Sequence, residues 1–125
     1  MGCEGWSYEE VLPYFKKSED NDTFDGRFHG TDGPMGVSQP AAPLPICDAF
    51  IAAAGQLGIP KNTDMNGDKQ DGAGYYQLTQ KHARRSSAAM AFLGQARGRP
   101  TLTIQMKARV RRIVVINGRA TGVER

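Results

Sequence analysis

Residues 110–124 read VRRIVVINGRATGVE, and this stretch predicts a β-hairpin. The run Val110–Ile116 is rich in β-branched residues, which favour strands. Asn117-Gly118 is the strongest two-residue signal for a tight hairpin, because a type I′ turn requires positive φ at both positions and these residues tolerate it. Arg119–Glu124 then returns as the second strand. We expect a further strand just upstream, over Thr101–Met106, where side-chain character alternates.

Three helices are predicted before this hairpin. Ser7 and Glu10 have the spacing of a capping box, so we expect a helix over residues 8–18, with Pro13 kinking or shortening it. Apolar residues at helical spacing predict a second helix over Pro45–Leu57, which Gly58 and Pro60 then end. Ser86 or Ser87 is expected to cap a short third helix over residues 87–95.

The remaining residues predict loops with two short strands, one around Met35 and Val37 and one over Tyr75–Gln80. Glycine and proline concentrate between residues 26 and 45 and again between 67 and 74. Loops of this length in a compact domain are uncommon unless they cover a site or another part of the protein. The sequence therefore predicts a mixed α+β fold with long ordered loops.

Composition excludes several classes of protein. The net charge is +3, with basic and acidic residues mixed along the chain, so a nucleic-acid partner is not indicated. Cys3 and Cys47 have no second cysteine or histidine at metal spacing, which predicts two reduced thiols. No apolar run approaches the roughly 18 residues that a membrane span needs. We therefore expect a cytoplasmic protein without a transmembrane segment.

The residues alone indicate no catalytic constellation and no metal site. His29 lies in a Gly-rich loop, where a structural or lid role is favoured over catalysis, and His82 is expected to be solvated at a strand end. Asp64–Asp68 resembles the start of a calcium loop, but Lys69 and Tyr75 stand where that loop needs Gly and a bidentate Glu. A surface loop is the favoured interpretation.

The chain resembles the glucose-methanol-choline oxidoreductases, in particular the branch of choline and alcohol dehydrogenases. The stretches that carry the resemblance are, in order, Gly5–Glu19, Phe28-His29-Gly30 with Gly33-Pro34, Ala49-Phe50, Gly58-Ile59-Pro60, Asn66-Gly67, Gly74–Gln77, Arg84–Ala89, Leu102-Thr103-Ile104, Val110–Ile113 and Arg119–Glu124. Each stretch is weak alone, whereas their common order along one chain is specific.

The resemblance implies part of a two-domain flavoenzyme fold that oxidises the CH–OH group of a small-molecule alcohol by hydride transfer to FAD. Residues 1–96 would belong to the substrate-binding region, and residues 97–125 would return to the FAD-binding domain. It assigns one cofactor contact, the backbone of Val110 at the adenine end of FAD. The family's Gly-rich fingerprint and active-site His match no residues of this sequence, so we expect no catalytic residue here and no activity from the isolated chain.

Two departures and two alternatives accompany the resemblance. Ala83 stands where many relatives have glycine, which leaves the geometry of this turn open, because alanine resists positive φ. Ser86 replaces a frequent aromatic residue and could widen a pocket wall. The alternatives to an enzyme fragment are a stand-alone, non-catalytic binding module and a subunit that another chain completes. An oligomer is compatible with each of these readings.

Overall fold

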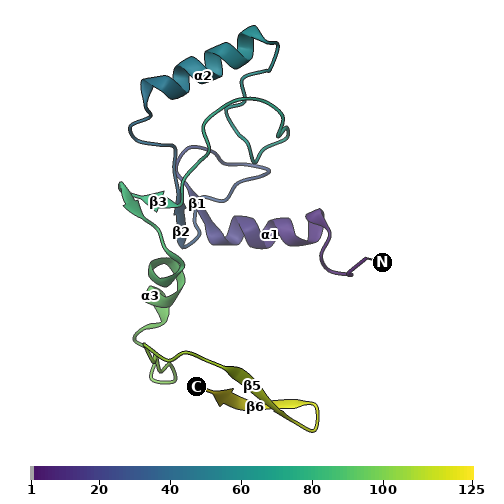
Figure 1. Cartoon of the computed structure of the whole chain (residues 1–125), viewed down its shortest axis with the longest axis vertical. Coiled ribbons are helices and arrows are strands. Elements are labelled where there is room, and N and C mark those ends of the chain that lie inside the picture. Colours follow the sequence, from purple (N-terminus) through teal and green to yellow (C-terminus); the bar gives the residue numbers. More distant parts are fainter. Residues whose placement is uncertain (1) are drawn as a thin grey trace. The chain divides into compact units, whose positions relative to one another are not determined.

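The structure, a computed structural model, describes residues 2–125 and combines helices with short strands (Figure 1). The mixed α+β fold that the sequence predicts is therefore confirmed. The chain divides into two compact units, Met1–Gln95 and Ala96–Arg125. The division falls next to the predicted limit at residue 96. Which domain of a complete flavoenzyme each unit belongs to stays a prediction.

The first helix, α1, spans Tyr8–Ser18 and begins with the predicted capping box. Glu10 Oε2 accepts hydrogen bonds from the Ser7 amide at 3.0 Å and from the Ser7 hydroxyl at 2.6 Å. The bond from the Ser7 side chain is the main cause of a lowered pKa for Glu10. Of the two effects expected at Pro13, the shortening is wrong, because the helix keeps all 11 residues, and the kink stays a prediction. Proline removes only one amide here, and Glu9, whose carbonyl loses that partner, is exposed to water.

Two short parallel strands follow α1. The strand β1 spans Glu19–Asn21 and pairs with β2, Met35–Val37, so that Asp20 lies opposite Gly36. The sequence predicted β2 but not β1, because Asp and Asn disfavour strands. The intervening loop is bonded back to β1, with the Gly33 amide donating to the Glu19 carbonyl at 2.8 Å.

The second helix, α2, spans Pro45–Gln56 and confirms the prediction to within a residue. Pro45 occupies its first turn, and Gly58 follows its end with φ +82°. Only Ala54 is buried, whereas Ile46 and Phe50 are each 71% exposed. The apolar stripe that predicted the helix is therefore exposed to solvent in the described structure.

A two-stranded antiparallel ribbon, β3 (Gln80–Lys81) and β4 (Arg84–Arg85), follows a long loop. The predicted strand over Tyr75–Gln80 is wrong for most of its length. Leu78 makes only an isolated bridge to Ser38, because no other strand of the described chain runs beside these residues. The sequence indicated a strand end at His82 and a turn at Ala83, but β4 was not predicted.

The predicted third helix is confirmed, with a different internal geometry. A π-helical turn, η1, spans Ala89–Leu93 and continues into α3, Gly94–Ala96. Ser87 Oγ accepts a hydrogen bond from the Met90 amide at 3.3 Å, which identifies Ser87 as the capping serine.

The second unit contains the hairpin that the sequence predicts most clearly. The strands β5 (Arg112–Ile116) and β6 (Arg119–Glu124) are antiparallel, and Asn117 and Gly118 have φ angles of 50° and 75° (Figure 1). The strand begins at Arg112 rather than at Val110. The strand expected over Thr101–Met106 is wrong, because this segment pairs with no other strand in residues 2–125.

The helices described in residues 2–125 are all too short or too polar to cross a membrane.

Candidate functional site

The second unit has a hollow at the base of its hairpin, and this hollow includes the candidate cofactor contact. Its volume is about 660 Å³, and Val110 lies in its wall with 52% of its surface exposed. The lining residues are Gln105–Arg111 and Arg125. Val110 precedes β5 by two residues, so the hairpin fixes where it lies.

The main chain of Val110 lies beyond the last hydrogen bond of the hairpin. The last hydrogen bond at this end of the hairpin runs from the Arg111 amide to the Glu124 carbonyl, at 2.7 Å. Neither the amide nor the carbonyl of Val110 has a partner among residues 2–125. A main-chain amide and carbonyl that remain unpaired can donate and accept side by side, which is the pattern that the edge of an adenine ring presents.

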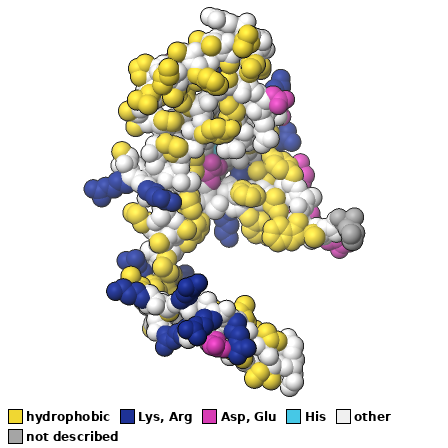
Figure 2. All heavy atoms as spheres, viewed as in Figure 1, with side chains coloured by type: hydrophobic (Ala, Val, Ile, Leu, Met, Phe, Trp, Pro, Cys, Tyr) yellow, Lys and Arg dark blue, Asp and Glu magenta, His cyan; other side chains and the backbone are white. Residues whose placement is uncertain are grey.

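The charged side chains in the hollow all have one sign. They belong to Lys107, Arg109, Arg111 and Arg125, and no Asp or Glu side chain lines the hollow among the described residues. Figure 2 shows Lys and Arg side chains gathered on this unit. A concave surface lined by cationic side chains attracts anions such as phosphate. The lining of this hollow therefore fits a ligand that carries phosphate.

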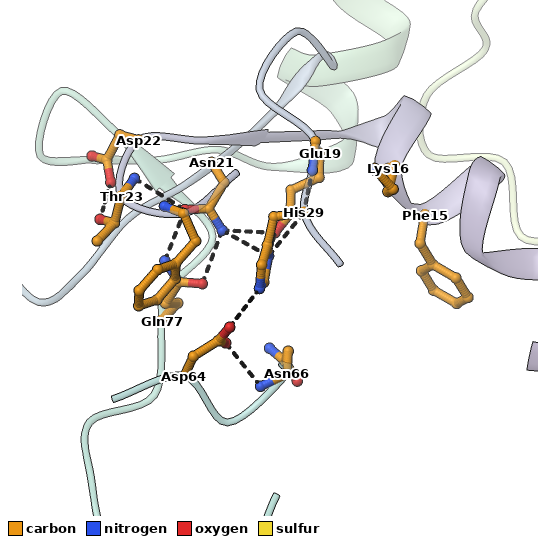
Figure 3. A network of polar contacts seen from close by, with 12 residues as sticks. Phe15, Lys16, Glu19, Asn21, Asp22, Thr23, His29, Asp64, Asn66 and Gln77 are labelled. Carbon is orange, nitrogen blue, oxygen red and sulfur yellow. Dashed lines mark hydrogen bonds and ion pairs between the residues drawn. The ribbon is translucent and has the colours of Figure 1, made fainter. Parts of the chain in front are cut away.

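The first unit contains a second candidate, a polar cluster around His29 (Figure 3). His29 is only 4% exposed. Its Nδ1 lies 3.2 Å from both carboxylate oxygens of Glu19, and its Nε2 lies 3.0 Å from Asp64 Oδ2. The ring of Phe24 covers it, with 5.5 Å between ring centroids. The imidazole therefore bridges β1 and the loop that contains Asp64.

The two carboxylates decide the charge of His29. Burial disfavours the imidazolium, but hydrogen bonds to Glu19 and Asp64 and the negative charges of both residues outweigh it, so the pKa of His29 is raised. Because both ring nitrogens face carboxylates, each must carry a proton to donate. The protonated form fits the geometry.

Asn21 completes the cluster from the end of β1. Asn21 and Gln77 form a reciprocal pair, with Nδ2 to Gln77 Oε1 at 2.9 Å and Gln77 Nε2 to Asn21 Oδ1 at 3.0 Å. Asn21 Oδ1 also accepts from the amides of Thr23 and Phe24. These donors fix the orientation of the Asn21 amide, so Nδ2 faces Glu19 and His29.

The remaining residues that the sequence singled out have structural positions. Asp64 points at His29, and its Oδ1 accepts from the Asn66 amide at 3.1 Å. His82 is exposed in the β3–β4 turn. Ser86 is buried and accepts from the Gly36 amide at 3.0 Å, while Cys3 and Cys47 are free thiols.

Sequence reasoning found His29 but missed its partners. Glu19, Asn21 and Asp64 follow no spacing rule relative to His29, and Gln77, which orients the Asn21 amide, lies 56 residues after Asn21. The only available signal was Glu19, an acidic residue placed directly after a helix.

Comparison with known proteins identifies the family. The family model described as GMC oxidoreductase matches residues 1–125. The chain belongs to the GMC oxidoreductase family. The resemblance that the sequence indicated is therefore confirmed over the whole chain.

Relatives in the family include choline dehydrogenases. The chain is 42% identical over 124 residues to oxygen-dependent choline dehydrogenase of Sinorhizobium fredii, covering 99% of the chain and 22% of that relative. The Klebsiella pneumoniae protein of the same name is 42% identical over 125 residues, 98% of the chain and 23% of the relative. The chain thus spans less than a quarter of the length of these GMC oxidoreductases.

A solved GMC-like structure has the same fold. Pyridoxine 4-oxidase from Mesorbium loti superposes with a TM-score of 0.83 at 34% identity, covering 94% of this chain and 24% of that one.

Proposed function

We propose that this chain is part of an FAD-dependent oxidoreductase that oxidises the CH–OH group of a small alcohol of the choline type. The observation that carries the proposal is the 42% identity to choline dehydrogenase over 99% of the chain. Bound flavin would accept the hydride from the alcohol carbon. The residues of this chain would contribute binding and positioning.

In this proposal the second unit holds the adenine end of FAD. The free amide and carbonyl of Val110 would pair with the donor and acceptor on the adenine edge. The cationic lining of the same hollow, Arg109 and Arg111 included, would offset the negative charge of the phosphates. Neither contribution depends on the side chain of Val110.

A pair of substitutions at Val110 tests the assignment in a complete enzyme that contains this chain. Val110→Pro deletes the amide, so we expect loss of FAD. Val110→Ala keeps the main chain, and because the side chain is half exposed we expect FAD content close to that of the unsubstituted enzyme. The measurement is the ratio of flavin to protein absorbance, with circular dichroism to confirm folding. Equal loss of FAD in both folded variants would contradict a main-chain contact.

A second candidate function, a subunit that another chain completes, follows from the small core. The buried apolar residues of the described chain are Ala54, Ala73 and Ala91, whereas Phe50, Leu57 and other large side chains are exposed. Such surfaces favour a partner that covers them. Flavin absorbance that appears only when a second polypeptide co-purifies would support this candidate over a fragment of one chain.

A further inference from the structure

The side-chain amide of Asn21 faces more acceptors than it has hydrogens. Its Nδ2 carries two hydrogens, yet it lies 2.9 Å from Glu19 Oε1, 2.9 Å from Gln77 Oε1 and 3.1 Å from His29 Nδ1. The reciprocal pair with Gln77 uses one hydrogen. The other must go either to Glu19 or to His29.

Whether His29 Nδ1 carries a proton determines which of the two acceptors receives the second hydrogen of Asn21 Nδ2. When Nδ1 is protonated it has no free lone pair, so it donates to Glu19, and Asn21 also donates to Glu19. When Nδ1 is unprotonated it can only accept, and Asn21 Nδ2 is the donor within reach. Glu19 Oε1 would then lose both of its donors and face a lone pair at 3.2 Å.

We propose that His29 and Asn21 form a proton-operated switch in which loss of the Nδ1 proton transfers the Asn21 hydrogen bond from Glu19 to His29 and releases the Glu19 carboxylate. Nε2 keeps its proton and its bond to Asp64 in both states, because no other donor serves Asp64 Oδ2 among the described side chains. The loop that contains Asp64 therefore stays attached while the Glu19 side changes.

Release of Glu19 loosens the loop after β1. Glu19 Oε2 accepts a hydrogen bond from the Gly30 amide at 3.0 Å, and the Glu19 side chain is only 18% exposed. A carboxylate that has lost two of its donors is better solvated in water than in this cluster, so it turns outward and the Gly30 amide loses its partner.

Other charged groups near His29 do not replace the two carboxylates. A hollow beside His29 is also lined by Lys16 and Lys17 from α1 and by Asp25 and Asp32 from the following loop. The Lys16 ammonium donates to the Gly26 carbonyl. No hydrogen bond or ion pair joins any of these four to His29 in the part of the chain that the structure describes, whereas Glu19 and Asp64 contact it directly.

Nitrogen NMR of the full chain labelled at histidine tests the switch, because the chain has only two histidines. We expect both ring nitrogens of His29 to be protonated below pH 6.5, and only Nε2 to be protonated once the pH has risen through the pKa of His29. The protection of the Gly30 amide from exchange, relative to the intrinsic rate at each pH, should fall across the same transition. The exposed His82 contributes the other pair of ring-nitrogen signals.

Two outcomes overturn the proposal. These are a neutral His29 protonated at Nδ1, and a protection of the Gly30 amide that does not follow the titration of His29. Two variants separate the partners. Glu19→Gln removes the anion, so His29 should titrate at lower pH, whereas Asn21→Ala removes the donor to neutral Nδ1, so His29 should titrate at higher pH. Shifts in the same direction for both variants would reject the role of Asn21.

Discussion

Ala83 lies in the two-residue turn between β3 and β4 with φ +58°. The left-handed conformation costs an L-residue roughly 1–2 kcal/mol, whereas glycine adopts it freely. Many relatives are expected to have glycine here, and the turn has formed despite the alanine. We therefore expect Ala83→Gly to raise the free energy of unfolding by about 1 kcal/mol, less a few tenths for the entropy of the unfolded chain. Urea denaturation measures it.

The matched control is Ala53→Gly inside α2, where glycine should lower the free energy of unfolding by about 0.5–1 kcal/mol. The same substitution is thus expected to have opposite signs at the two positions. A loss of stability at both would show that the turn does not strain Ala83.

His29 makes stability depend on pH. Hydrogen bonds and charges from Glu19 and Asp64 outweigh burial and raise its pKa above the ordinary value of 6.5. The folded state then binds a proton more tightly than the unfolded state, so the stabilisation is complete below pH 6.5 and is lost as pH rises through the folded pKa. We expect the free energy of unfolding to fall as pH increases from 6.5, and to fall less steeply in His29→Gln. Equal slopes in urea titrations of the two proteins would contradict this.

At the scale of elements, the contact between α1 and the loop after β1 depends on Gly30. A Cβ added there would lie 1.9 Å from the Lys16 carbonyl oxygen, so the backbone would have to move. We expect Gly30→Ala to lower the free energy of unfolding by about 3 kcal/mol. Gly55→Ala in α2 is the control, because its added methyl meets nothing within 4 Å and should raise helix stability by up to about 1 kcal/mol. Similar changes in the free energy of unfolding for Gly30→Ala and Gly55→Ala would show that the loop moves to accommodate the added methyl group.

The sequence predicted the elements whose signals are local. The cap at Ser7, the cap at Ser87 and the Asn117-Gly118 turn each need only a few neighbouring residues, and all three formed. Elements that depend on a distant partner were missed or wrongly placed. The polar β1 exists because β2 lies beside it, and the strand-like Thr101–Met106 has no neighbour within the described chain.

The candidate sites show the same difference between local signals and contacts with distant residues. Val110 was assigned from the resemblance to the family. Its main chain has no partner because the pairing of the hairpin strands ends at Arg111. In the first unit, His29 was visible as a rare residue in a Gly-rich loop. Its function as a bridge was not, because Glu19 and Asp64 reach it from segments 10 and 35 residues away. Long-range side-chain contacts of this kind leave no spacing in a single sequence.

At the scale of the whole molecule, the exposed apolar surface and the length of the relatives both favour further protein packed against these residues. The 125 residues cover about 22% of the choline dehydrogenases that they match. Large side chains such as Trp6, Phe50 and Leu57 are more than two-thirds exposed in the described structure. Burial of such side chains is worth roughly 1.5–3 kcal/mol each, so more protein packed against them would add much to stability.

The isolated 125-residue chain should therefore neither retain FAD nor oxidise choline. The hollow at Val110 offers one end of a binding site, and a dinucleotide also needs a Gly-rich turn at a helix N-terminus to hold its pyrophosphate. We expect the purified chain to show no flavin absorbance after incubation with FAD and removal of free FAD by dialysis, and no reduction of a dye acceptor when choline is added. A complete choline dehydrogenase assayed in parallel is the positive control. Steady turnover by the isolated chain would show that these residues contain a catalytic base, and His29 and His82 would then be the first candidates to substitute.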